Sequence, residues 1–297
     1  MTDSRVIALG FFDGVHIGHG ALLRCAKERA ESLGCRSSAL SYDTHPLQII
    51  TGADVSLIST MSEREWLIKT LYGIDEVIFS PFDRSVMQTP WETFLEEYLI
   101  GTLHASHLIC GADFRFGYHG EGTAELLAQA CRARGIGCDV IEKVELDGEA
   151  VSSTRIRARL LDGQIEDASR LLGHRHLMSG VVTVGQRLGR KLGFATANLP
   201  LSKSIAKPPR GVYCAEVLTP DGVMHHAVCN LGIHPTAGSL PAPVLEAHLL
   251  DFEADLYGQY LRVFLYKMLR PEQRFSSLEA LCEQIAHDRE TTRAYFA

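Results

Sequence analysis

The sequence predicts an α/β domain, in which a parallel sheet carries helices on both faces, followed by a domain built as an antiparallel β-barrel or sandwich with a closing helix. From residue 5 to about 145, short β-rich runs alternate with helical patterns, which is typical of a parallel sheet covered on both faces. From about His174 onward, alternating strand patterns separated by loops rich in glycine and proline take over, which indicates antiparallel pairing. The domains are therefore expected at residues 1–173 and 174–297.

The first domain is expected to alternate strands with helices. The β-rich runs lie at residues 6–9, 37–42, 75–82, 107–111 and 138–144, and the helical patterns lie at residues 20–34, 62–71, 90–99 and 123–135. The first helix is expected to begin near Gly18 or His19 and to close on Gly34. Segments 62–65 and 89–92 have the pattern of capping boxes, the second with proline at the first helical position.

Two short helices, at residues 152–163 and 164–173, are expected before the second domain begins. The strand patterns of that domain lie at residues 179–184, 211–218, 225–232, 244–250 and 260–269. From Ser276 onward, leucine and isoleucine share a single helical face, which predicts one closing helix. The sequence shows no internal repeat, so two unlike domains are the simplest organisation.

Composition and charge argue against several classes of protein. The chain has 29 basic and 36 acidic residues, and a formal net charge of −7 argues against general binding of nucleic acid. The sequence has no apolar run long enough for a membrane helix and no signal-peptide pattern, so a cytoplasmic protein without a membrane partner is expected. The eight cysteines form no C-x-x-C pair, which favours buried, reduced thiols over disulfides or zinc.

A glycine-rich turn with two histidines, GFFDGVHIGH at residues 10–19, follows the first strand. A strand, a glycine turn and a helix in this order aim unpaired backbone N–H groups and the positive end of a helix at one point, which suits phosphate. His16 and His19 can share one helical face and donate from their rings to the same phosphate oxygens. The alternative is a tight turn that carries two surface histidines.

Local positive charge is concentrated in two clusters, which are Arg155, Arg157 and Arg159 in one and Arg187, Arg190 and Lys191 in the other. Because the net charge is negative, any phosphate site must depend on such local clusters. The first cluster lies in SSTRIRAR, which by itself also fits a helix N-cap followed by solvated arginines.

Four segments in this order, GFFDGVHIGH, SYDTHP (41–46), GADFRFG (111–117) and SSTRIR (152–157), resemble the FMN adenylyltransferase module of prokaryotic bifunctional riboflavin kinase/FAD synthetases. The resemblance implies a Rossmann-like nucleotidyltransferase domain in which His16 and His19 are catalytic. It also implies that Asp13 lies near the metal and the turn, and that Asp113 and Phe114 border a pocket shared by adenine and flavin. The ATP-binding residues that it implies are Gly10, Phe11, Asp13, His16, Gly18, His19, Ser153, Thr154 and Arg157.

The reaction implied for this module is attack of the FMN phosphate on the α-phosphorus of ATP, with release of pyrophosphate and help from Mg²⁺. Because the nucleophile is already an anion, no general base is expected, and catalysis depends on positioning and on stabilisation of charge.

A second candidate site lies in GQRLGRKLGFATANLP at residues 185–200. In an extended backbone, residues i and i+2 point to the same side, so the Thr196 hydroxyl and the Asn198 carbonyl oxygen can meet on one cation or phosphate. Oxygen ligands of this kind suit Mg²⁺. By itself, however, this triplet more often belongs to an ordinary strand.

The segments RGVYCAEV (210–217), NLGIHPT (230–236), VLEAHLLDF (244–252), DLYG (255–258) and FLYKMLR (264–270) follow this stretch. Together they resemble the riboflavin kinase module. The resemblance implies that Thr196 and Asn198 bind Mg-ATP and the metal, under a loop that contains Gly185, Arg190 and Gly193. It also implies that Glu246 is the general base for the ribityl 5′-hydroxyl of riboflavin, a neutral alcohol that benefits from loss of its proton. Without these motifs, Glu246 would be an outward residue of an alternating strand.

The sequence departs from the two family patterns at several positions. In the kinase half, Ala195 stands where proline is usual, and His234 and Ala237 replace common Arg and Phe residues. Ala195 is expected to weaken ATP binding without abolishing it. In the first half, Gly20, Gly120 and Thr123 replace common Gln, Arg and Asp residues. The missing arginine matters most, because a planar guanidinium is not readily substituted.

Three functional hypotheses follow. The leading one is a bifunctional enzyme that converts riboflavin to FMN and FMN to FAD with two ATP. The second keeps only the adenylyltransferase, with a kinase domain impaired by the departures. The third is a flavin- or nucleotide-binding sensor without catalysis. The partners are small molecules, and the sequence leaves the oligomeric state and the physiological metal open.

Overall fold

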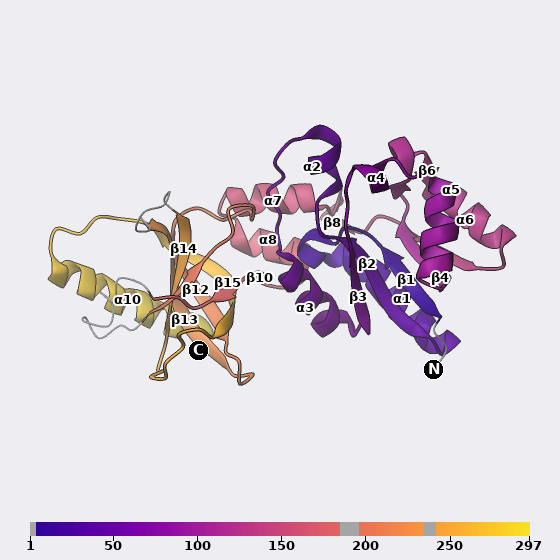
Figure 1. The fold of residues 1–297 in the computed structure, drawn as a ribbon. Coiled ribbons are helices and arrows are strands. Elements are labelled where there is room, and N and C mark those ends of the chain that lie inside the picture. The colour runs from indigo at the N-terminus through magenta and orange to yellow at the C-terminus, as the bar shows by residue number, and fades with distance from the viewer. Residues whose placement is uncertain (1–3, 185–195, 235–241) are drawn as a thin grey trace. The chain divides into compact units, whose positions relative to one another are not determined.

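The computed structural model describes residues 4–184, 196–234 and 242–297. The chain divides into two compact units, Met1–Ser153 and Thr154–Ala297 (Figure 1). This division falls at the start of the first of the two helices predicted at residues 152–173, and the domain boundary near residue 173 stays a prediction. Within the described ranges, no helix combines the length and the hydropathy that crossing a membrane requires.

A five-stranded parallel sheet with strand order β3-β2-β1-β4-β7 forms the centre of the first unit. Its strands are β1 (Arg5–Leu9), β2 (Arg36–Tyr42), β3 (Glu76–Ser80), β4 (Ala105–Gly111) and β7 (Gly137–Ile141). All neighbouring pairs are parallel, which confirms the predicted sheet. The central strand β1 is almost wholly buried, as a parallel strand covered on both faces must be.

Helices cover both faces of this sheet. On one face, α1 (Ile17–Leu33) packs on β1, β2 and β4, with α3 (Met61–Tyr72) beside it. On the other face, the π-helix η2 (Phe94–Thr102) and α6 (Ala124–Ala133) enclose a core with strand residues such as Ile7, Leu9 and Leu108. Helix α1 begins close to its predicted start and ends at Gly34, whose φ of 65° closes the helix as expected.

Short elements connect these helices and strands. They are α2 (Pro46–Thr51), α4 (Arg84–Met87), α5 (Trp91–Thr93), the 3-10 helices η1 (Asp13–Val15) and η3 (Tyr118–Gly120), and the paired strands β5 (Arg115–Phe116) with β6 (Gly122–Thr123) and β8 (Glu145–Leu146) with β9 (Glu149–Ala150). The α-helix expected at residues 90–99 is thus one α-helical turn that continues as the π-helix. A bond from the N–H of Leu103 to the carbonyl of Tyr98, five residues back, shows the wider turn.

The two predicted capping boxes are wrong. Helix α3 is capped by Thr60, whose hydroxyl accepts from the N–H of Glu63 while the Glu63 carboxylate accepts from the N–H of Thr60. At the second position, the Thr89 hydroxyl donates to the Ser85 carbonyl, and α5 has no side-chain cap. Several Ser and Thr residues near a helix start fit the local pattern, and the direction from which the chain enters the helix decides which one caps.

Six antiparallel strands in the order β10-β15-β12-β13-β14-β11 form the sheet of the second unit. They are β10 (His176–Val181), β11 (Ala197–Pro200), β12 (Gly211–Leu218), β13 (Met224–His234), β14 (Ala242–Leu249) and β15 (Tyr260–Pro271). Thr183, just after β10, forms an isolated bridge to Asn198 of β11, so the two outer strands approach each other. Of the two predicted alternatives, the barrel is therefore correct.

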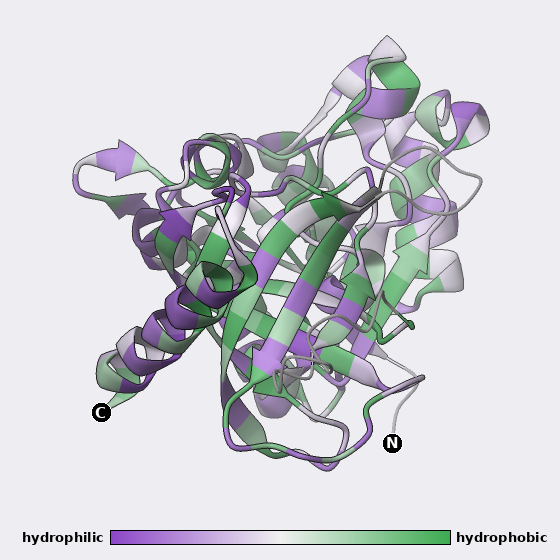
Figure 2. Ribbon diagram, turned by 90° about the vertical axis from the view of Figure 1, so that its left-hand side faces the viewer, coloured by the Kyte–Doolittle hydropathy of each residue, from purple (hydrophilic) through white to green (hydrophobic). Residues whose placement is uncertain are grey.

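In the part of the chain that the structure describes, three helices accompany this barrel. The two short helices are present as α7 (Ser153–Leu161) and α8 (Ile165–Leu172), and the closing helix α10 (Leu278–Phe296) packs on β12 and β13. Figure 2 shows hydrophobic residues concentrated along the strands, whereas the helix that ends at the C-terminus carries hydrophilic residues over much of its surface. This distribution is that of an amphipathic helix with one face on a barrel.

Candidate active sites

The turn between β1 and α1 has a strained backbone and is held by a buried side chain. Phe12 and Val15 have backbone φ angles of 57° and 45°, values that residues other than glycine rarely adopt. The buried Asp13 holds the turn, because its Oδ1 accepts hydrogen bonds from the N–H of Ile58 (2.8 Å) and of Ser59 (3.1 Å). Asp13, which is predicted to lie near a metal, therefore fixes the turn to residues 58 and 59.

The two predicted histidines lie together at the N-terminus of α1. Their rings stack with centroids 3.5 Å apart and planes inclined by 15°. The Nδ1 atom of His16 accepts from the backbone N–H of His19 at 3.2 Å, so His16 is the N-cap of the helix. A Cβ at Gly18 would approach the His16 ring to 3.1 Å, which explains why glycine suits this position.

The electrostatic surroundings keep His19 neutral. Burial is the main cause that holds the pKa of His19 well below its ordinary value, and electrostatic interactions with His16 and Arg64 add to the effect. Since the Nδ1 of His16 is an acceptor, the proton of the neutral His16 ring lies on Nε2. The turn thus presents neutral imidazole donors and the positive end of α1 at one place.

The structure places the residues of SSTRIR in different ways. The Ser153 hydroxyl donates to the carbonyl of Asp13 at 3.0 Å, which ties this residue to the histidine turn within the first unit. Thr154 and Arg157 belong to α7 in the second unit, and their contact with ATP phosphates stays a prediction.

An apolar cavity of about 580 Å³ lies in the first unit. Its walls are formed by Tyr42, Pro46, Ile50, Phe82, Val86, Met87, Phe94 and the segment Phe114–Gly120. Phe114 lines it and stacks on Phe116 with ring centroids 5.4 Å apart, and its place beside adenine and flavin stays a prediction. Asp113 is not among the lining residues, and its carboxylate pairs with Lys143 at 3.2 Å. Gly120, where the family often has arginine, lies in the cavity wall. The same wall contains the cationic side chain of Arg115 and the imidazole of His119.

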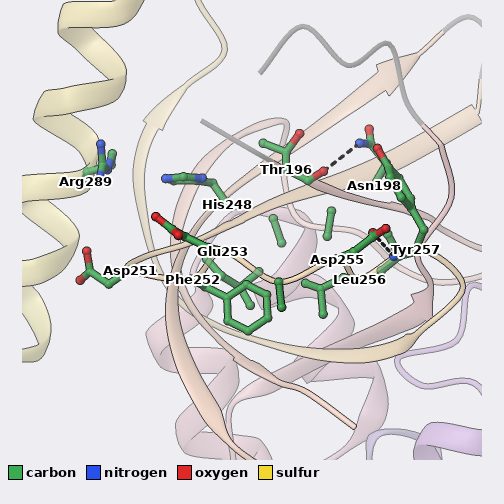
Figure 3. Close-up of a pocket in the computed structure, with 15 residues that line it drawn as sticks. Thr196, Asn198, His248, Asp251, Phe252, Glu253, Asp255, Leu256, Tyr257 and Arg289 are labelled. Atoms are coloured by element: carbon green, nitrogen blue, oxygen red, sulfur yellow. Dashed lines mark hydrogen bonds between the residues drawn. The ribbon is translucent and has the colours of Figure 1, made fainter. Parts of the chain in front are cut away.

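A second cavity, of about 680 Å³, lies in the second unit (Figure 3). Both Thr196 and Asn198 line it, and their contact with ATP and a metal ion stays a prediction. Asn198 is 9% exposed, and its Nδ2 donates to the Thr196 carbonyl at 3.5 Å. The predicted residues Gly185, Arg190 and Gly193, and the departures Ala195 and Ala237, lie outside the described residues, as does the side chain of His234.

Glu246 lies directly opposite Asn198 in the pairing of β14 with β11. Residues opposite each other in an antiparallel pair project from the same face of the sheet, so Glu246 shares the face of the predicted ligand. His248, two residues further along β14, shares this face and lines the cavity, whereas Glu246 itself is not among the lining residues. The pairing thus supports a place for Glu246 beside the cavity.

The sequence patterns did not indicate several side chains that line the second cavity. Figure 3 shows His248, Asp251, Glu253 and Arg289 on one side of the second cavity, with Thr196 and Asn198 on the other. Arg289 comes from α10, which local patterns describe only as a closing helix. The segment 251–257, which supplies three carboxylates, was visible in part as the motif DLYG. Among the described residues, no group of three or more His, Cys, Asp or Glu side chains could hold a metal ion.

Comparisons with known proteins treat the two halves separately. A family model described as FAD synthetase matches residues 1–155, and one described as riboflavin kinase matches residues 172–296.

A solved structure named as a macrolide-efflux protein from Streptococcus pneumoniae has a TM-score of 0.85 and 28% identity to this chain, with 99% of this chain and 95% of that chain covered. The same fold therefore occurs over the whole length of another chain.

Curated relatives are similar over nearly the whole chain. The bifunctional riboflavin kinase/FMN adenylyltransferase of Escherichia coli K12 is 36% identical, with 99% of this chain and 93% of the relative covered. The proteins of the same name from Bacillus subtilis and Listeria monocytogenes are 33% and 31% identical, with 98% and 100% of this chain and 92% and 94% of the relatives covered. With a family model on each half and such relatives over both, the chain belongs to the bifunctional riboflavin kinase/FMN adenylyltransferase family.

Proposed function

We propose that this chain phosphorylates riboflavin to FMN in its second unit and adenylylates FMN to FAD in its first, with one ATP for each step. The observation that carries the proposal is that each half matches its own family model and holds its own cavity, lined by residues of that half's motifs. The non-catalytic sensor and the adenylyltransferase alone are not favoured by this arrangement.

In the first unit, the neutral rings of His16 and His19 bind the ATP phosphates from the N-terminus of α1. An oxygen of the FMN phosphate forms a bond to the α-phosphorus, and the bond from that phosphorus to pyrophosphate breaks. Because FMN phosphate is an anion, no proton has to be removed, and the histidine donors together with the helix dipole stabilise the charge that develops. The cavity that Phe114 and Phe116 line is the proposed place for the flavin ring.

In the second unit, Glu246 accepts the proton of the ribityl 5′-hydroxyl while that oxygen forms a bond to the γ-phosphorus of ATP and ADP leaves. Thr196 and Asn198 would hold Mg²⁺. This donor set fits the ion. Because the Nδ2 atom of Asn198 donates to the Thr196 carbonyl, the side-chain oxygen of Asn198 is the atom that can bind a cation. When bound, the ion neutralises charge on the triphosphate.

The proposed compartment is the cytoplasm. All eight cysteines are free thiols, which is typical of a reducing compartment, and both proposed reactions consume ATP.

Product analysis tests the proposal. The purified chain is incubated with Mg²⁺ and ATP and with either riboflavin or FMN, and the flavins are separated. FMN and FAD are expected from riboflavin, and FAD from FMN. FAD from FMN alone would leave only the adenylyltransferase, and the absence of both products would contradict the proposal.

A further inference from the structure

Arg64, on α3, is a buried cation beside the histidine turn. It belongs to none of the motifs, and its residue is 0% exposed. Removing the charge of arginine from water is costly, and the nearby carboxylates of Asp13 and Asp43 offset only part of that cost. We therefore expect Arg64 to have a role that offsets the cost of burying its charge.

One nitrogen of the Arg64 guanidinium ties two strand ends together. Nη1 donates to the Phe11 carbonyl at 2.8 Å, to the Ser41 hydroxyl at 2.8 Å and to the Tyr42 carbonyl at 3.2 Å. Phe11 begins the histidine turn after β1, and Ser41 and Tyr42 end β2, the neighbouring parallel strand. Arg64 thus holds the turn at the carboxyl edge of the sheet, where ligands of such sheets bind.

The same bonds join the two parts of the proposed site. Tyr42 lines the apolar cavity, and Phe11 leads into the turn that carries His16 and His19. Arg64 therefore links the histidine turn to the cavity wall. In a transfer between two bound substrates, displacements of about 1 Å are costly.

The charge of Arg64 is only partly compensated. Among the described residues, its Nε and Nη2 atoms have no hydrogen-bond partner. The guanidinium carbon lies 4.3 Å from the ring centroid of Phe11 and 5.3 Å from that of Phe79, which offsets part of the cost of burial. Burial lowers the pKa of Arg64 to about 10, so the group is still a cation at neutral pH. Burial is the main cause of the lowered pKa of His19, and the positive charge of Arg64 adds to it.

We propose that Arg64 is a positioning residue of the adenylyltransfer site: it fixes the Phe11 turn against β2 and supplies a permanent positive charge behind the bound triphosphate. Since Arg64 is fully buried, it acts through the turn and not by contact with ATP. The inference rests on the proposed FMN adenylyltransferase function.

The test compares Arg64→Met, Arg64→Lys and the control Lys69→Met in the full chain. Lys69 lies on the same helix and is exposed, with its ammonium paired to Glu65 at 2.7 Å. FAD formation from FMN is measured at varied Mg-ATP, and riboflavin phosphorylation by the same protein reports on the second unit. Melting temperatures are recorded for every variant.

We expect Arg64→Met to lower kcat/KM for ATP in FAD formation by roughly 10²-fold, because both the turn and its fixed charge are lost. Arg64→Lys should regain about tenfold of this loss, since an ammonium keeps the charge and offers three N–H donors on one nitrogen. Lys69→Met should match the wild type, and riboflavin phosphorylation should be unchanged in all three variants.

Several outcomes would overturn the inference. They are wild-type FAD formation by Arg64→Met, an Arg64→Lys variant no better than Arg64→Met, and activities that simply follow the melting temperatures. If Arg64→Met does not fold, Arg64→Gln and Arg64→Lys give the same comparison of a neutral with a charged donor. A wild-type chain that makes no FAD from FMN would contradict the proposed function itself, before any variant is measured.

Discussion

The two ring nitrogens of His16 have different tasks. Its Nδ1 accepts from the backbone N–H of His19 and caps α1, so its Nε2 carries the proton that can be donated to a phosphate. The residue is 6% exposed and stacked on the His19 ring. One side chain therefore supports both the helix and the proposed chemistry, and the two roles can be separated by substitution.

We predict that His16→Asn keeps the cap but loses the phosphate donor. Asparagine is a good N-cap residue, so the free energy of unfolding of His16→Asn should exceed that of His16→Ala by about 1 kcal/mol. FAD formation from FMN should fall by roughly 10²- to 10³-fold in both variants, because a preorganised donor is lost. Chemical denaturation and product analysis measure the two effects. Full activity of His16→Asn would show that the histidine serves only as a cap.

Glu246 is predicted to act only in the kinase reaction. Glu246→Gln should lower the rate of FMN formation from riboflavin by roughly 10²- to 10⁴-fold, the range of a general base. FAD formation from supplied FMN should stay unchanged. Glu283→Gln, an exposed change on α10, is the matched control. Unchanged FMN formation by Glu246→Gln would remove Glu246 from the mechanism.

At the scale of elements, the packing of α1 against α3 explains one departure from the family pattern. A Cβ at Gly20 would lie 2.3 Å from the Tyr72 hydroxyl oxygen and 2.8 Å from its ring carbon. Tyr72 is the last residue of α3, so glycine at position 20 lets the two helices approach closely. The replacement of the common Gln therefore has a packing reason.

We predict that the effect of Gly20→Ala depends on Tyr72. In the wild-type chain the added methyl should cost about 1 to 3 kcal/mol of unfolding free energy through overpacking, reduced by up to about 1 kcal/mol because alanine favours the helix. In a Tyr72→Ala background, the same change should stabilise the protein. A double-mutant cycle from denaturation curves measures the coupling, and equal effects in both backgrounds would disprove the contact.

At the scale of the molecule, a buried histidine makes the stability of the second unit depend on pH. His176, on β10, is 1% exposed, and burial together with the nearby His174 lowers its pKa from 6.5 to about 3. In the unfolded chain His176 takes up a proton below about pH 6.5, whereas in the folded chain it stays neutral. The unfolded state then binds more protons, so stability falls as the pH is lowered from about 6.5 towards 3.

We predict that His176→Leu flattens this dependence. Between about pH 6.5 and 3, the unfolding free energy of the wild type should fall relative to that of the variant by about 1.4 kcal/mol per pH unit, because one additional proton binds on unfolding. Denaturation of both proteins over this pH range measures the difference. Parallel curves would show that His176 does not carry the acid sensitivity.

Local patterns were sufficient for the order and type of most elements and for the family. The parallel sheet, the two short helices, five of the six barrel strands and the closing helix were predicted, because the hydrophobic pattern of each element lies in residues that are close in the sequence, whereas β11 was not among the expected strands. His16, His19 and Thr196 stand in contiguous motifs, so their grouping did not depend on distant segments. Whether these residues carry the proposed roles stays a prediction.

The sequence by itself determined the two halves, their family and the segments that carry the motifs. The tertiary structure decided that Thr60 caps α3, that the sheet of the second unit closes at Asn198, and that Arg64 lies beneath the histidine turn. It also decided that Arg289 of α10 meets the cavity formed around β11 and β14. The physical reason is that a periodic pattern records which face of an element is buried, whereas its partner is chosen by contacts between residues far apart in the chain.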